Sequence, residues 1–189
     1  MNEKRIEHFN EIVNLRKEST EALLNYWEYF TFYTSFEYWL LVGFFLIPLI
    51  ILIKKIDKSN IFLIGFFGYC IHIATLYSNL LAVNLGLWNY PIQLIPTMPS
   101  FSLDSSLIPV TYMLAYQWTM IKNKNYYITI FVVSAFFSFI FEPLIVKLGM
   151  LKMYGEITHV HTFFVYIFIG LFAKFTTNIF LWLQKKYAS

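Results

Sequence analysis

Five apolar runs, each long enough to cross a lipid bilayer, occupy most of this 189-residue chain. They cover residues of about 36–53, 61–81, 101–121, 126–146 and 160–183. A helix needs about 20 apolar residues to cross the hydrocarbon core of a membrane. Lysines end the first and third runs, at Lys54 and Lys122. The pattern predicts an all-α, integral membrane bundle of five transmembrane helices, formed by residues 31–189.

The composition supports this class and excludes several others. The chain is 58% apolar and only 13% charged, whereas soluble domains are about 45–50% apolar and about 25% charged. A soluble globular enzyme and a disordered chain are therefore excluded, and a single cysteine cannot form an intrachain disulfide. The net charge of +3 comes from lysines at the ends of apolar runs, which membrane topology explains. We expect the lipid bilayer as a partner and no nucleic acid.

Residues 1–30 differ from the rest, since they contain six glutamates and four basic residues. Ile6, Phe9 and Val13 recur at helical spacing. The segment predicts an amphipathic helix that lies on the membrane or docks a partner membrane protein. A solvated tail helix is the alternative. Because no short apolar segment follows the polar N-terminus, we expect no cleavable signal peptide.

The basic residues at the ends of the runs predict the orientation in the cell membrane. With the C-terminus in the cytoplasm, that side carries seven lysines and the other side carries Lys147 and Lys152. Including the four basic residues of 1–30 changes the comparison from seven against two to seven against six. We expect the N-terminus outside and the C-terminus in the cytoplasm, since basic residues favour the cytoplasmic side.

Glu142 is the polar residue that most demands an explanation. It follows Ser134 and Ser138 at four-residue intervals, so the three share one face of the fourth predicted helix. A carboxyl group exposed to lipid costs several kcal/mol, so we expect Glu142 to face the interior of the bundle. It is the leading candidate for a ligand pocket.

Six further polar residues inside the runs are candidates to line that pocket. A rise of 1.5 Å per residue puts Asn79, Asp104 and Tyr166 at the level of Glu142, near the outer end. The same estimate puts His72, Tyr112 and Lys174 near the middle. The alternative for His72 is a hydrogen bond between helices, and Lys174 is equally explained as an anchor that reaches the cytoplasmic surface.

Residues 82–100 predict an outward-facing loop, because Pro91, Pro96 and Pro99 prevent a continuous helix. The loop is nevertheless apolar and aromatic. Trp88, Tyr90 and Pro91 predict either a cover over the level of Glu142 or a connector in the interface, with both rings among the headgroups.

Searches for metal and nucleophile motifs yield little. His159 and His161 are two residues apart and would point away from each other on a helix, and a pairing of Glu156 with His159 has no third ligand. No phosphate-binding, hydrolase or metalloprotease motif is present. We predict no catalytic residue, no metal site and no cofactor.

Several segments resemble a family of small multi-pass membrane proteins of spore-forming Firmicutes, for which no activity is established. They are Asn25-Tyr26-Trp27, the LGLWNYP stretch at 85–91, LIPTMP at 94–99, SLIPVTYMLAYQ at 106–117 and FEPLIVKLGM at 141–150. The resemblance covers nearly the whole chain and implies a five-helix membrane protein.

A fainter resemblance is to the heterodimer-type lycopene cyclases, which have a Trp-x-Tyr-Pro loop followed by a Pro-Val/Ile-Glu-Glu segment. Here Thr111 and Tyr112 stand where those enzymes have paired glutamates. The departure removes the acid–base pair that the resemblance would otherwise imply.

Three functions fit the sequence. The first is a non-enzymatic membrane protein that binds or helps move a small or lipidic molecule through a polar pocket near the outer leaflet. The second is an intramembrane enzyme acting on an isoprenoid or lipid, which requires a second carboxyl group close to Glu142. The third is a structural or accessory subunit of a membrane complex, with residues 1–30 docking its partner.

Overall fold

The computed structural model describes residues 3–30 and 33–187, and it is almost entirely helical. Four of its helical segments are long and apolar enough to cross a membrane, namely Phe36–Lys55, Lys58–Asn84, Tyr126–Lys147 and His159–Tyr187. Their bounds lie within four residues of the corresponding predicted runs. The structure is therefore compatible with an integral membrane protein, as the sequence predicts.

Local sequence explains where these helices begin and end. The Ser35 side chain accepts a hydrogen bond from the backbone of Tyr38 and caps α2 (Phe36–Lys55). A short 3-10 turn, η1 (Lys58–Asn60), leads into α3 (Ile61–Asn84). The Asn125 side chain likewise caps α5 (Tyr126–Phe136).

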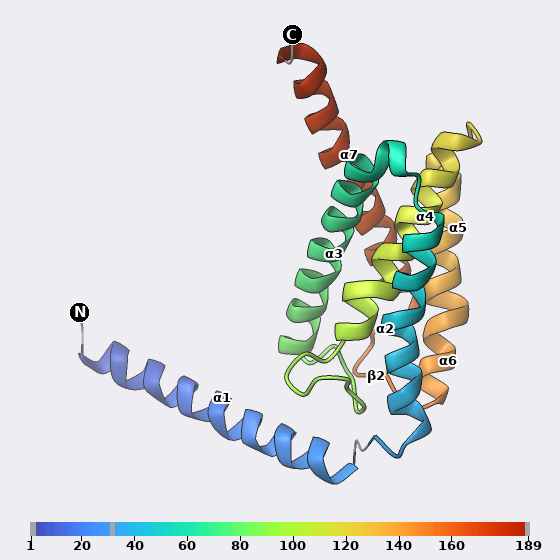
Figure 1. The fold of residues 1–189 in the computed structure, drawn as a ribbon. Coiled ribbons are helices and arrows are strands. Elements are labelled where there is room, and N and C mark those ends of the chain that lie inside the picture. Colours follow the sequence, from blue (N-terminus) through green and yellow to red (C-terminus); the bar gives the residue numbers. More distant parts are fainter. Residues whose placement is uncertain (1–2, 31–32, 188–189) are drawn as a thin grey trace.

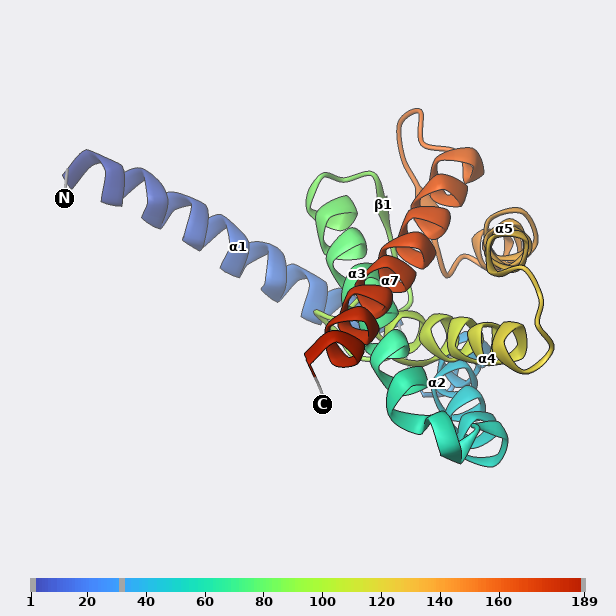
Figure 2. The same ribbon diagram turned by 90° about the horizontal axis from the view of Figure 1, so that it is seen from above.

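The remaining predicted run, the third at residues 101–121, has a different form. It consists of a π-helical turn, η2 (Leu103–Leu107), followed by α4 (Ile108–Ile121), which has only 14 residues. This segment packs against α2 and α3, and α4 also packs against α5. Its large side chains Tyr112 and Tyr116 are almost fully buried in the core of the bundle. The segment is thus central in the bundle, as the view from above shows (Figure 2).

A second π-helical turn, η3 (Phe137–Phe141), separates α5 from α6 (Glu142–Lys147). After each π-helical turn, one residue intervenes before a proline, Pro109 or Pro143. Proline lacks the backbone N–H of a regular helix and its ring clashes with the preceding turn, which explains the wider turn before each one. Such turns often occur at functional sites, and here Asp104 lies in one while Glu142 follows the other.

Lysine-containing turns lie at one end of the bundle and two paired loops lie at the other (Figure 1). The turns containing Lys54–Lys58 and Lys122–Lys124 lie at one end, where α7 (His159–Tyr187) extends beyond the other helices. At the opposite end, β1 (Trp88–Asn89) pairs antiparallel with β2 (Lys152–Met153). This pairing joins the loop after α3 to the loop after α6, so both cover the same end of the bundle.

The N-terminal helix α1 (Glu3–Phe30) projects sideways from that loop-covered end (Figures 1 and 2). None of its described residues is buried. The Trp27 indole donates a hydrogen bond of 2.8 Å to the backbone carbonyl of Gln93. This contact ties the end of α1 to the proline-rich loop.

Candidate ligand site: two buried carboxyl groups at one cavity

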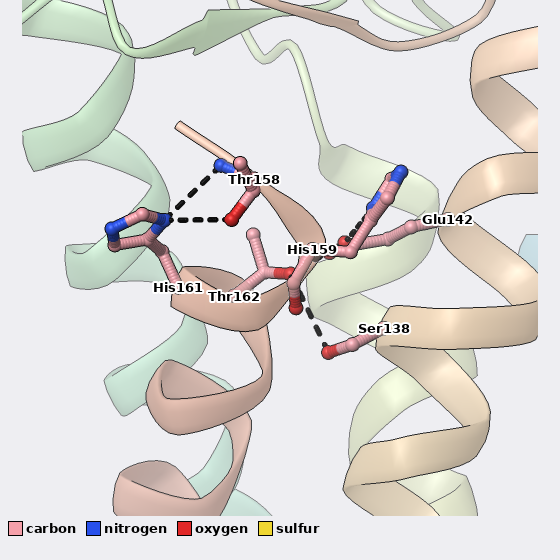
Figure 3. Close-up of polar contacts among 6 residues, drawn as sticks. All are labelled: Ser138, Glu142, Thr158, His159, His161 and Thr162. Carbon is pink, nitrogen blue, oxygen red and sulfur yellow. Dashed lines mark hydrogen bonds and ion pairs between the residues drawn. The ribbon is translucent and has the colours of Figure 1, made fainter. Parts of the chain in front are cut away.

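Glu142 begins α6 and its side chain faces the bundle interior, with only 5% of the residue exposed. Thr162 donates a hydrogen bond of 2.6 Å to its Oε2 atom, and His159 Nδ1 lies 3.2 Å from the same atom (Figure 3). Ser138 lies one turn before Glu142 and contacts Thr162. The first turn of α7 therefore holds this carboxyl group in place.

Asp104, in η2, is the second buried carboxyl group and is 1% exposed. The side-chain amide of Asn79 donates to both of its oxygens, at 2.8 and 2.9 Å, and Ser100 donates to one of them. His72 Nδ1 lies 2.7 Å from the backbone carbonyl of Asp104. These contacts satisfy a carboxylate in a site that water barely reaches.

Asn79 connects Asp104 to the loop. Its side-chain carbonyl accepts hydrogen bonds of 2.8 Å from both the Trp88 indole and the Tyr90 hydroxyl. Burial, reinforced by the neighbouring Asp104 and Glu142 carboxyl groups, raises the pKa of Tyr90 well above its usual range. Tyr90 thus stays neutral and remains a hydrogen-bond donor at physiological pH.

The two carboxyl groups line one cavity of about 30 Å³, which we call the polar cavity. Its other polar lining includes Asn79, Thr162 and Tyr166. A cavity needs about 10–15 Å³ on this measure to hold one water molecule. The polar cavity therefore has room for about two waters, or for a group as small as a hydroxyl or an ammonium.

The other predicted pocket residues lie outside this cavity. Tyr112 is fully buried, and its hydroxyl lies 3.1 Å from Ser134 Oγ and donates to the backbone carbonyl of Tyr166. His72 reaches the polar cavity only through the backbone of Asp104. Lys174 lies over the rings of Tyr116 and Tyr126, at 4.7 and 5.3 Å from their centroids. The structure therefore brings together Glu142, Asp104, Asn79 and Tyr166, and leaves Lys174 in a separate aromatic cluster.

Two of the three predicted loop residues contact the polar cavity, as the interpretation of the loop as a cover expects. Trp88 and Tyr90 turn inward to Asn79 and line the polar cavity, and Tyr90 is buried. Pro91 is half-buried and is not among the described residues that line it. The two rings therefore form an inner cover, because their polar atoms find a partner in Asn79 that water would otherwise provide.

Sequence reasoning missed the role of His159, which contacts Glu142 rather than Glu156. His159 and His161 do point apart on α7, and His161 Nδ1 contacts the backbone N–H of Thr158 (Figure 3). The described residues contain no group of three side chains able to hold a metal ion.

An apolar groove runs beside the polar cavity. It has a volume of about 380 Å³ and lies between α3 and α7, lined by Leu81, Ala82, Phe164 and Phe168. The groove and the polar cavity share three lining residues, Ser78, Trp88 and Val165.

Comparisons of the chain with protein-family models, with curated proteins and with solved structures found no match. The resemblances drawn from the sequence motifs therefore stay predictions.

Proposed function

We propose that this protein is a non-enzymatic, multi-pass membrane protein that binds a small or lipidic molecule. The polar cavity receives the end of that molecule that donates hydrogen bonds. The observation that carries the proposal is that Glu142 and Asp104, from different parts of the chain, line the same small space. Buried carboxyl groups are expensive in a membrane and mark functional sites. Its two carboxyl groups accept hydrogen bonds, so the ligand group that we propose for it is a hydroxyl or an ammonium.

The proposal includes five membrane crossings, with the segment Leu103–Ile121 as the third. Its 19 residues are close to the length that a crossing requires. Lysines near the ends of α2, α4 and α7 favour that end of the bundle as the cytoplasmic side. The polar cavity then opens toward the outer leaflet of the cell membrane. A reporter enzyme that is active only outside the cytoplasm should be inactive when it is fused after Tyr187. Activity of that fusion would contradict this orientation.

The N-terminal helix α1 then lies along the outer surface as an amphipathic helix. Ile6, Phe9, Val13, Leu24 and Trp27 share one side of the helix at helical spacing. Trp27 contacts the loop that covers the bundle, which favours turning the apolar side toward the membrane. A partner membrane protein docked on the same side is the competing interpretation.

An intramembrane enzyme acting on an isoprenoid or lipid is a second candidate, and one observation favours it. The second carboxyl group that such an enzyme requires lines the same cavity as the first. Two carboxyl groups in different environments can serve as acid and base. His159, which is partly exposed and contacts Glu142, would connect that acid to water.

The test is native mass spectrometry of the detergent-purified protein, comparing bound molecules across variants. We expect at least one species to copurify with the wild type and to be lost from Glu142→Gln and Asp104→Asn. Glu156→Gln is the matched control, because Glu156 is exposed in the loop before α7. An identical set of bound molecules in all four proteins contradicts the proposal.

A further inference from the structure

The groove between α3 and α7 is a second space, next to the polar cavity. Its volume of about 380 Å³ lies within the range of about 300–1,000 Å³ that is typical of small-molecule sites. Leu81, Phe164 and Phe168 are exposed along it, on helices long and apolar enough to span a membrane. An apolar space at this position suits a hydrocarbon chain.

The groove and the polar cavity are neighbours rather than separate features. Ser78, Trp88 and Val165 line both spaces, so a single layer of side chains separates them. Trp88 belongs to the loop and not to a spanning helix, and one hydrogen bond holds its indole on Asn79. Rotation of Trp88 about its side-chain bonds would join an apolar space to a polar one.

The lining determines which polar end such a molecule can have. Asp104 and Glu142 accept hydrogen bonds, whereas an ionised carboxylate or phosphate end has little or no hydrogen to donate and is repelled by either carboxyl group when that group is ionised. The polar cavity also has room for only about two waters, which excludes a large headgroup. A hydroxyl or an ammonium fits both restrictions.

We propose that the ligand is a single-chain lipid, a long-chain alcohol or amine, whose chain lies in the groove between α3 and α7 and whose polar end enters the polar cavity past Trp88. This inference rests on the proposed function and specifies its ligand class. The joined spaces match a molecule that is apolar along its length and a hydrogen-bond donor at one end.

The experiment uses the full-length protein in lipid nanodiscs with a photoactivatable long-chain alcohol, and an acid of the same chain as comparator. Adducts are mapped by mass spectrometry on the unmodified protein. We expect the alcohol to label Leu81, Phe164 and Phe168 in preference to the lipid-facing surface elsewhere, and the acid to label them far less. Uniform labelling of all lipid-facing helices, or equal labelling by the acid, overturns the proposal.

A matched pair of variants blocks the groove selectively. Leu81 lines the groove and Leu80 does not, although both are exposed on α3. Leu81→Trp should lower labelling about tenfold, which corresponds to about 1.4 kcal/mol of binding free energy. Leu80→Trp should leave labelling unchanged. Equal labelling of the two variants contradicts the proposal, and thermal unfolding of both verifies that each is folded.

The outcomes separate this inference from the proposed function. If the wild type shows no adducts in the groove while Glu142→Gln still loses the copurified species, the proposal of a lipid chain in the groove is wrong. The polar cavity then remains the proposed site. If Glu142→Gln leaves groove labelling unchanged and the alcohol and the acid label equally, the ligand does not place its polar end in the polar cavity. Labelling that needs both Leu81 and Glu142 supports the complete proposal.

Discussion

The two halves of the bundle accommodate charge in opposite ways. In the half that the loop covers, Glu142 and Asp104 are held by directed hydrogen bonds from Thr162, Asn79 and Ser100, beside the polar cavity. In the other half, Lys174 is held by aromatic rings and by one long contact of 3.5 Å to the Tyr116 hydroxyl. Hydrogen bonds fix a carboxyl group in one position, whereas ring faces stabilise a cation without fixing it. This difference favours the acidic half as the candidate site.

The largest effect should follow from removing the residue that organises the acidic half. Asn79→Ala removes the shared partner of Trp88 and Tyr90 and two of the hydrogen bonds to Asp104, which keeps the one from Ser100. We expect a loss of about 3–5 kcal/mol in the free energy of unfolding, because the buried Asp104 carboxyl group loses two hydrogen bonds and Trp88 and Tyr90 lose their acceptor. Denaturant titration in mixed micelles measures it. Asn84→Ala is the control, since Asn84 is exposed and bonds only within α3. Similar losses in both variants would show that the network is unimportant.

A somewhat smaller effect is expected where α7 packs closely against α4 and α5. A Cβ atom added at Gly170 would lie 2.7 Å from Ile130 Cγ2 and 3.1 Å from Tyr112. Gly170→Ala should therefore destabilise the protein by about 1–3 kcal/mol through overpacking. Gly65→Ala meets no atom within 4 Å and should be neutral or slightly stabilising. Thermal unfolding distinguishes the two, and the reverse order would contradict the packing.

Tyr90→Phe sharpens the comparison within the acidic half. It removes one hydrogen bond to Asn79 and should cost about 1 kcal/mol. Because burial raises the pKa of Tyr90, the folded state favours its neutral form. The wild type should therefore lose this contribution as the pH rises above about 10, the pKa of a tyrosine in an unfolded chain, toward the higher pKa of the folded state. The difference in unfolding free energy between wild type and variant should shrink over that range, and a constant difference would contradict the burial of Tyr90.

The smallest effect is expected in the other half. Lys174→Met replaces the cation with an apolar side chain of similar length among Tyr116 and Tyr126. We expect a change of less than about 1 kcal/mol, the usual size of a cation–π contact. A loss as large as that of Asn79→Ala, measured by the same titration, would erase the contrast between the two halves.

Much of this arrangement could be predicted from the sequence. The apolar runs that end at Lys54 and Lys122 predict the helix positions, because length and hydropathy decide which segments suit a membrane. The rise per residue in a helix was enough to put Asn79, Asp104 and Tyr166 at the level of Glu142. The free-energy cost of a carboxyl group in lipid was enough to predict that Glu142 faces the interior of the bundle.

The rest depends on contacts between helices, which spacing along one helix does not contain. The partner of Glu142 is His159, which is 17 residues away across the turn before α7. The inward position of Trp88 and Tyr90 depends on the Asn79 carbonyl, which only folding brings to the loop. The π-helical turns before Pro109 and Pro143 shift the faces of both carboxyl-bearing segments, and regular helical periodicity does not anticipate them.

The most direct test of a polar end bound at Glu142 is its reaction with dicyclohexylcarbodiimide, a lipophilic reagent that modifies protonated carboxyl groups. Adducts at Glu142 would be quantified by mass spectrometry after preincubation with a long-chain alcohol or with an acid of the same chain. We expect the alcohol to slow modification of Glu142 and the acid to leave its rate unchanged. Modification at the same rate with and without the alcohol would contradict this expectation.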